Sequence, residues 1–457
     1  MQNIEINDTK VCSLSNFPYL YTRKNAIKMT TQELLPIVAE LREEFLKENF
    51  KGKCTREEER EIDLESKLAQ VVIGVRRSGK STLCRKVLRE AKVKAAYVNF
   101  DDERLEGMQR EDLNNMLEAL YIVYGDFDYL LLDEVQNVDG WPLFVNRLLR
   151  QNMHLVITGS NAKLLSNELM THLTGRHHKI ELFPFSFEEY AKCKGIDTAS
   201  MTTKGQALAK SALNDYLLQG GFPELLNERN PQNYIMGLID GIIRRDITKR
   251  FNVRYPEILQ RLATYLMDNF AQEYNAATLA KMFNVSDHTI DTYCGYLQEA
   301  FLLLSAHKFS YKSRDRIRGN KLYVVDTAFI SNRTNTFSTQ NMGWRLENVI
   351  FVELLHRASQ HYADVFYYRD RNFEIDFLVA RTGIVEELYQ VCYDLTNEKT
   401  RKREINGLVQ GAKKFNCQSL TIITFSETDT IHIDQLTIQI VTATNWLTTK
   451  NSMMPNT

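Results

Sequence analysis

One eight-residue run, Gly74-Val75-Arg76-Arg77-Ser78-Gly79-Lys80-Ser81, constrains the fold of this chain more than any other feature. It matches the pattern G-x-x-x-x-G-K-[ST] in full, follows an apolar run that ends at Ile73, and leads into helix-favouring residues from Thr82. Glycines in such a loop let backbone N–H groups curl around an anion, and the start of the following helix adds a favourable dipole. The run therefore predicts a strand, a phosphate-binding loop and a helix within a parallel α/β sheet.

The residue types of this loop are those that bind a nucleoside triphosphate, which we expect to be ATP. We expect Lys80 to reach the β- and γ-phosphates and the Ser81 hydroxyl to bind Mg²⁺. The residues expected to contact the nucleotide are Gly74, Arg77, Ser78, Gly79, Lys80, Ser81 and Thr82.

A second element of the same chemistry follows about 50 residues later. The apolar run Tyr129–Leu132 ends in Asp133 and Glu134. In phosphate-loop ATPases the aspartate in this position belongs to the Mg²⁺ shell. The glutamate after it is placed to polarise the attacking water as a general base. We therefore expect Asp133 to bind Mg²⁺ and Glu134 to be catalytic.

A third apolar run, Leu155–Thr158, ends in Gly159, Ser160 and Asn161. A polar side chain here can lie between the γ-phosphate and the attacking water, and we assign that catalytic role to Asn161. The alternative is a helix N-cap at Ser160 or Asn161, and both functions can hold with one residue each.

Length, charge and cysteine content limit the class of protein. The chain has 457 residues, which favours two to four domains, and a net charge of −1, so any nucleic-acid surface must be a local patch. The seven cysteines are scattered without a C-x-x-C pair, which indicates neither a disulfide framework nor a cysteine zinc site. The N-terminus is polar and the apolar runs are too short to span a bilayer. We expect a cytoplasmic protein that does not enter a membrane.

Taken in order, these motifs resemble the AAA-type ATPases of bacteria and archaea. The resemblance covers residues 67–395 and includes Leu173-Thr174-Gly175-Arg176. It implies that Arg176 is an arginine finger or nucleotide sensor, acting in cis or from a neighbouring subunit. The alternative is that Arg176 is a surface arginine in a turn, without a role in catalysis. The sequence leaves the oligomeric state open.

The rest of the chain divides into three further stretches by pattern. Residues 1–66 predict a helical N-terminal extension, in which Arg56–Glu61 is interpreted as a charged surface segment, and residues 67–205 predict the ATPase domain. Residues 206–335 predict a helical linker and a winged-helix domain, with helices on either side of Asn284 and the second capped by Ser286 or Asp287. A basic stretch that ends at Lys321 suggests contact with DNA phosphates. Its candidate contacts are Lys308, Lys312, Arg314, Arg316 and Arg318.

Residues 336–457 resemble the restriction-endonuclease-like α/β fold. That resemblance implies a metal-dependent site at Glu347, Asp376 and Gln390. The family pattern requires lysine where this chain has Cys392, and a cysteine cannot supply the cation that stabilises phosphorane charge. We therefore expect a degenerate nuclease domain, with Lys399 as the candidate substitute if it is active.

Three functions remain open from the sequence. The leading one is Mg²⁺-dependent ATP hydrolysis coupled to conformational change, with DNA or a protein as partner. The second is an ATP-gated DNA nuclease, and the third is a nucleotide-switched protein-binding scaffold with slow turnover.

Overall fold

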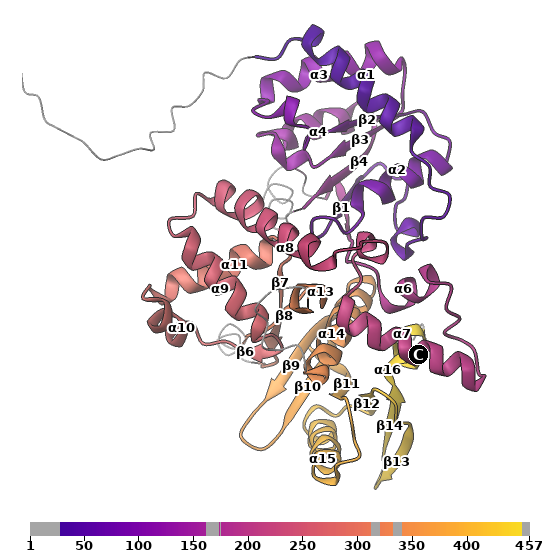
Figure 1. Ribbon diagram of the computed structural model, residues 1–457, viewed down its shortest axis with the longest axis vertical. Coiled ribbons are helices and arrows are strands. Elements are labelled where there is room, and N and C mark those ends of the chain that lie inside the picture. Colours follow the sequence, from indigo (N-terminus) through magenta and orange to yellow (C-terminus); the bar gives the residue numbers. More distant parts are fainter. Residues whose placement is uncertain (1–27, 161–172, 174, 312–319, 332–340, 450–457) are drawn as a thin grey trace, which may run out of the picture.

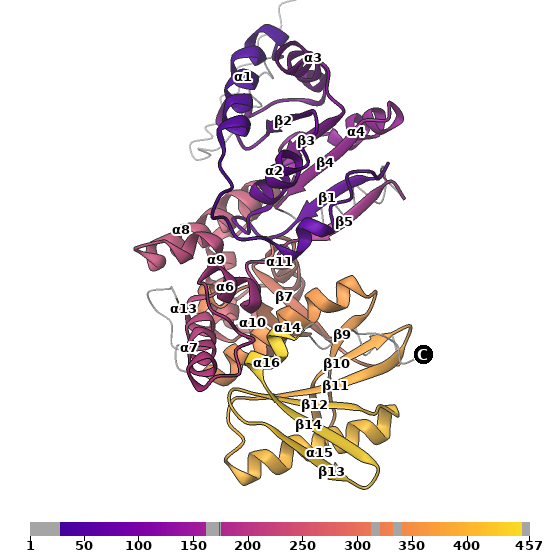
Figure 2. The same cartoon turned by 90° about the vertical axis from the view of Figure 1, so that its right-hand side faces the viewer.

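The computed structural model describes residues 28–160, 173, 175–311, 320–331 and 341–449. Two β-sheets organise these residues (Figure 1). A parallel sheet with its helices occupies one end of the molecule, a larger mixed sheet occupies the other, and helices α8–α11 lie beside and between them (Figures 1 and 2).

The first sheet contains five described strands in the order β2-β3-β4-β1-β5, all parallel. Its strands are β1 (Ala69–Ile73), β2 (Ala95–Asn99), β3 (Tyr129–Asp133), β4 (His154–Gly159) and β5 (His177–Glu181). β1, β3 and β4 are almost fully buried, as expected of strands covered on both faces. The parallel α/β sheet predicted from the sequence is confirmed, and the carboxyl ends of these three strands meet at one edge.

Helices α1 (Thr31–Lys47), α2 (Lys80–Glu90), α3 (Leu113–Tyr124) and α4 (Trp141–Arg150) pack around this sheet. α1 begins with a capping box between Thr30 and Glu33. Its apolar face, which includes Leu34 and Val38, is buried against α3 and β2. The N-terminal helix is therefore part of the core of this region.

A mainly helical stretch follows the parallel sheet. It contains α6 (Phe187–Cys193), α7 (Thr203–Gln219), α8 (Pro231–Gly241), a π-helix (Ile242–Lys249) that continues α8, α9 (Pro256–Asp268), α10 (Ala276–Phe283), α11 (Asp287–Glu299) and α13 (Ala328–Ser331). The predicted turn lies between α10 and α11, and Ser286 caps α11 by accepting a hydrogen bond from the Thr289 N–H.

The second sheet has the order β13-β14-β12-β11-β10-β9-β7-β8-β6 among the described residues. Its strands are β6 (Gln272–Glu273), β7 (Leu303–Lys308), β8 (Asn320–Val324), β9 (Asp364–Arg369), β10 (Glu374–Arg381), β11 (Ile384–Cys392), β12 (Ser419–Thr424), β13 (Asp429–Ile433) and β14 (Leu436–Thr442). Helices α14 (Met342–Gln360), α15 (Glu398–Phe415) and α16 (Ala443–Thr448) pack against it. Because β7 pairs with β9, strands from the stretch predicted as a winged helix and from the stretch predicted as nuclease-like belong to one sheet.

Two features concern the chain as a whole. Within the described ranges, every helix is too short or too polar to cross a bilayer. Cys54 and Cys193 form a disulfide between the segment after α1 and the end of α6, which the scattered cysteines did not predict.

Candidate nucleotide-binding site

The phosphate-binding loop joins β1 to α2, as the sequence predicts. A Cβ atom on Gly74 would lie 2.0 Å from the carbonyl oxygen of Leu182, so no other residue fits there. Gly79 has a φ of 100° and forms the N-cap of α2, a conformation that favours glycine. These two glycines let the backbone turn tightly and point its N–H groups toward the space above the loop.

Lys80 lies inside this loop and is almost fully buried. Its ammonium donates hydrogen bonds of 3.1 Å to the carbonyl oxygens of Gly74 and Val75, and it lies 3.6 Å from Glu134 Oε1. A buried ammonium held by neutral carbonyls and one carboxylate has unused attraction for an anion. Lys80 is therefore placed to bind phosphate at the loop.

Asp133 ends β3 beside this lysine and is buried. It accepts hydrogen bonds from Ser81 Oγ at 2.9 Å, from Tyr97 Oη at 3.2 Å, and from Thr158 Oγ1. Burial, reinforced by the charge of Glu134, raises the pKa of Asp133, and the hydrogen bonds only partly offset this. A buried carboxylate beside a hydroxyl is a hard oxygen donor set, and it fits Mg²⁺.

Glu134 follows at once in a left-handed backbone conformation, with φ of 51°. Such strain in a non-glycine residue persists where the surroundings fix it, and here the Glu134 N–H donates to Thr158 Oγ1 at 3.0 Å. Burial would raise the pKa of Glu134, but the charge of Lys80 and a hydrogen bond from Gln136 lower it below its ordinary value. The side chain is therefore an ionised carboxylate at the mouth of the loop.

These groups line one open cleft of about 810 Å³. Its wall includes most of the residues predicted from the sequence, namely Arg77, Ser78, Gly79, Lys80, Ser81, Thr82, Asp133 and Glu134. The structure thus brings the two halves of the predicted site together. Thr158 contacts Asp133 and the Glu134 N–H, and Gln136 contacts the Glu134 side chain, although sequence reasoning gave neither residue a role. For Thr158 the available signal was a hydroxyl at the end of a buried strand.

Of the two other predicted catalytic residues, only Arg176 can be placed relative to this cluster. Asn161 lies outside the described residues. Arg176 is exposed, and its carbonyl bonds the N–H of Ala69 at the start of β1. The phosphate-binding loop follows the other end of β1, which is 5 residues long. At about 3.3 Å per residue, the two ends of this strand are about 16 Å apart. Arg176 therefore lies at the opposite end of β1 from the phosphate-binding loop of its own chain.

Arg56 is a contact of the loop that the sequence did not indicate. The interpretation of Arg56–Glu61 as a charged surface segment is wrong, because Arg56 and Glu58 are both buried. The Arg56 guanidinium donates to the carbonyl oxygens of Ser78, at 3.1 Å, and Phe183, at 2.8 Å, and to Glu189 at 2.9 Å. Arg56 therefore holds the phosphate-binding loop in place through the Ser78 carbonyl.

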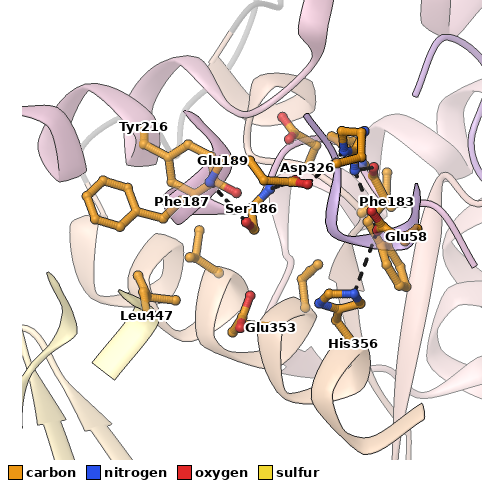
Figure 3. A pocket seen from close by; sticks show the side chains of 15 residues that line it. Glu58, Phe183, Ser186, Phe187, Glu189, Tyr216, Asp326, Glu353, His356 and Leu447 are labelled. Carbon is orange, nitrogen blue, oxygen red and sulfur yellow. Dashed lines mark hydrogen bonds and ion pairs between the residues drawn. The ribbon is translucent and has the colours of Figure 1, made fainter. Parts of the chain in front are cut away.

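This arginine borders a pocket that α6 and α14 line from two sides. Figure 3 shows Glu58 and His356 joined there, with Ser186, Glu189 and Tyr216 lining the same pocket. The Glu58–His356 distance is 3.6 Å. The segment that supports the phosphate loop thus also contacts the helix that carries Glu347.

The predicted nuclease-like residues lie in a separate cavity of about 790 Å³, which Glu347, Asp376 and Gln390 line. Gln390 is engaged with the backbone, since its Oε1 accepts from the Asp376 N–H at 2.8 Å and its Nε2 donates to the Glu374 carbonyl at 3.1 Å. Burial, together with the charge of Glu347, raises the pKa of Asp376 well above its ordinary value. Gln390 bridges β10 and β11 rather than pointing freely into the cavity.

Lys321 supplies a buried cation to this cavity. It is 5% exposed and lies 2.8 Å from Glu374 and 3.5 Å from Glu347. Lys399, the substitute considered from the sequence, is exposed at the start of α15. The interpretation of Lys321 as part of a DNA-contacting stretch is wrong, because its charge is buried against these carboxylates.

The remaining candidates for DNA contact divide into two groups. Lys308 lies on β7 and is half-buried. Lys312, Arg314, Arg316 and Arg318 lie outside the described residues.

Comparisons with known proteins show what this chain is similar to. A family model described as "AAA domain" matches residues 66–191, and a second, "Domain of unknown function (DUF8612)", matches residues 210–340. Among solved structures, the Walker-type ATPase PABY2304 of Pyrococcus abyssi is 14% identical, with a TM-score of 0.40, over 66% of this chain and 96% of that one. The Aeropyrum pernix ORC1 protein in complex with DNA is 12% identical, with a TM-score of 0.28, over 73% and 96%.

Two curated relatives match most of the chain. The uncharacterized protein MJ1544 of Methanocaldococcus jannaschii is 36% identical over 80% of this chain and 84% of its own length. An uncharacterized protein of Haemophilus influenzae is 30% identical over 83% of this chain and 94% of its own length. The chain therefore belongs to the same family as these two proteins, and it carries an AAA-type P-loop ATPase domain.

Proposed function

We propose that this protein hydrolyses ATP with Mg²⁺ and uses the reaction to change the arrangement of its helical and C-terminal parts. One observation carries the proposal. Lys80, Asp133 and Glu134 meet at the carboxyl ends of β1 and β3, the two strands that flank β4, with the Lys80 ammonium 3.6 Å from the Glu134 carboxylate. A cytoplasmic location is part of the same proposal.

The chain's own residues account for the chemistry. The N–H groups of the loop and the Lys80 ammonium bind the phosphates, and Lys80 neutralises charge that develops on the transferred group. Ser81 and Asp133 would hold Mg²⁺, which screens the phosphate oxygens. Glu134, ionised and anchored through Thr158, accepts a proton from the attacking water or orients it.

ATP turnover by three variants tests this assignment. Lys80→Ala removes the phosphate-binding cation and should abolish ATP binding. Glu134→Gln keeps the shape of the side chain, so binding should persist while turnover falls by about 10²–10⁴-fold, the usual contribution of a general base. Glu228→Gln, in the same cleft, is the matched control and should hydrolyse ATP like the wild type. Turnover that is indifferent to Glu134→Gln would remove the base assignment.

Part of the proposal is that residues 256–324 form a winged helix. The order α9, β6, α10, α11, β7, β8, with β8 antiparallel to both β6 and β7, supports it. However, α11 carries Asp287 and Asp291 and no lysine or arginine. Phosphate contact would then fall to the β7–β8 connection and Lys308. ATPase rates with single- and double-stranded DNA across a salt series test this, since stimulation by DNA should fade at high salt.

An ATP-gated nuclease is the second candidate, favoured by Lys321 lying with Glu347 and Asp376 at one cavity. The engagement of Gln390 with the backbone argues against it. Cleavage of DNA with Mg²⁺ or Mn²⁺ that is lost in Asp376→Ala would support this activity. Absence of cleavage under ATP-saturated conditions would leave the cavity as a charged network that joins β8, β10 and α14. ATP binding with negligible turnover would favour the third candidate, a nucleotide-switched scaffold.

A further inference from the structure

Both arginines of the phosphate loop reach out of the parallel-sheet region. Arg77 lies 2.6 Å from Glu224, which precedes α8, and both side chains are half exposed. Arg76 lies 2.6 Å from Asp101 and 3.4 Å from Asp246. Asp246 belongs to the π-helix that continues α8, and α8 lies below the parallel sheet in Figure 1.

Asp246 is the more enclosed of these partners, with a side chain 12% exposed. The charged groups that act on it are Arg76, Glu134, Lys80 and Asp101. A carboxylate from the helical region therefore lies within the electrostatic reach of the two residues expected to handle the γ-phosphate. π-Helical turns occur frequently at functional sites, and this one carries the carboxylate.

The acidic partners of Arg76 already outnumber it before any nucleotide binds. Arg76 is a loop cation with two acidic partners, and ATP would bring several negative charges to the same loop. A γ-phosphate beside Arg76 would be a third anion on one cation in a partly buried site, and mutual repulsion would act first on the longer contact, that to Asp246. The Asp246 contact and a bound γ-phosphate are therefore alternatives.

We propose that Asp246 is a positioning residue of the nucleotide site, which competes with the γ-phosphate of ATP for Arg76. When ATP binds, Arg76 turns toward the phosphates and the π-helix is released from the loop. When the γ-phosphate leaves, the Arg76–Asp246 pair forms again. This inference rests on the proposed ATP site and adds how that site signals to the helices that follow the parallel sheet.

The experiment compares ADP with a non-hydrolysable ATP analogue, both with Mg²⁺, on the full chain. Asp246→Asn removes the competing charge. The control is Asp240→Asn on α8, which removes the same charge from an exposed pair with Arg244 at 2.6 Å. Affinity is measured by calorimetry, and hydrogen exchange is followed in residues 242–249.

Asp246→Asn should tighten binding of the ATP analogue by about fivefold or more, the lower end of typical coupling between sites, and that of ADP clearly less. Asp240→Asn should match the wild type for both nucleotides. In the wild type the ATP analogue, but not ADP, should raise exchange in residues 242–249. Arg76→Ala should remove this difference, and it provides the test if Asp246→Asn does not fold.

Equal affinities in Asp246→Asn and Asp240→Asn, with exchange in 242–249 indifferent to nucleotide, would overturn the inference while leaving ATP binding intact. Failure of the proposed ATP site looks different, because the wild type itself would then bind neither nucleotide. Both results are read from the same titrations.

Discussion

Replacing Arg56 by methionine tests whether the segment before the parallel sheet supports the phosphate loop. The guanidinium is 7% exposed and holds two buried carboxylates, Glu189 at 2.9 Å and Glu58 at 3.6 Å. It also donates to the Ser78 carbonyl in the loop. Methionine keeps much of the apolar volume but removes the charge and all of these bonds.

The expected loss of stability follows from the buried carboxylates that Arg56→Met leaves in place. Glu58 and Glu189 would stay buried without their cation, and breaking a buried ion pair in this way costs about 3–5 kcal/mol. Exposed arginine pairs contribute about 1 kcal/mol or less. Arg104, which pairs with Glu40 at 2.5 Å and Asp102 at 2.8 Å but is 38% exposed, supplies that comparison.

The free energy of opening should be measured by hydrogen exchange in peptides from β1 and β4, since this reports the sheet region without assuming that the whole chain unfolds in one step. Arg56→Met should lower this free energy of opening several times more than Arg104→Ala does. The loss should shrink as pH falls from 7 towards 5, because burial already raises the pKa of Glu58 and a protonated carboxyl needs no cation. Equal effects of the two substitutions, or a loss independent of pH, would refute this reasoning.

Three further predictions follow from the same contacts. Burial raises the pKa of Asp246 to about 6, so the gain in ATP affinity from Asp246→Asn should be full at pH 8 and should diminish in calorimetry below pH 6, where the native side chain is already neutral. Lys321→Met should make hydrogen exchange in β8 and β10 faster by lowering the free energy of opening by about 3–5 kcal/mol, because Glu347 and Glu374 lose their buried cation. Arg176→Ala should leave turnover unchanged in dilute, monomeric protein, because this residue lies at the far edge of the sheet; loss of turnover under those conditions would contradict its placement.

The buried strands were the most predictable part of the fold. Apolar runs such as Tyr129–Leu132 and Leu155–Thr158 lie in strands covered on both faces, so hydrophobicity alone reveals them. β5 was missed because it is an edge strand of sequence HHKIE in which only Ile180 is buried. β13 is likewise an edge strand, in the second sheet, and its residues are largely exposed.

The candidate site was predictable where neighbouring residues act together and unpredictable where distant ones do. Gly74–Ser81 and the Asp133–Glu134 pair carry their chemistry in local order, so a pattern reveals them. Arg56, Asp246 and Lys321 each contact a partner that lies 22 or more residues away in the sequence, and a charge in the sequence does not say whether folding buries it. For each of them the tertiary contact decided the role.

The central claim is that Lys80 and Glu134 act in one hydrolytic site. The most direct measurement is phosphate release from ATP with Mg²⁺, made in parallel with calorimetric ATP binding, for the wild type, Lys80→Ala and Glu134→Gln. We predict turnover in the wild type, loss of binding in Lys80→Ala, and retained binding with turnover lowered by about 10²–10⁴-fold in Glu134→Gln. Retained ATP binding in Lys80→Ala, or undiminished turnover in Glu134→Gln, would contradict the claim.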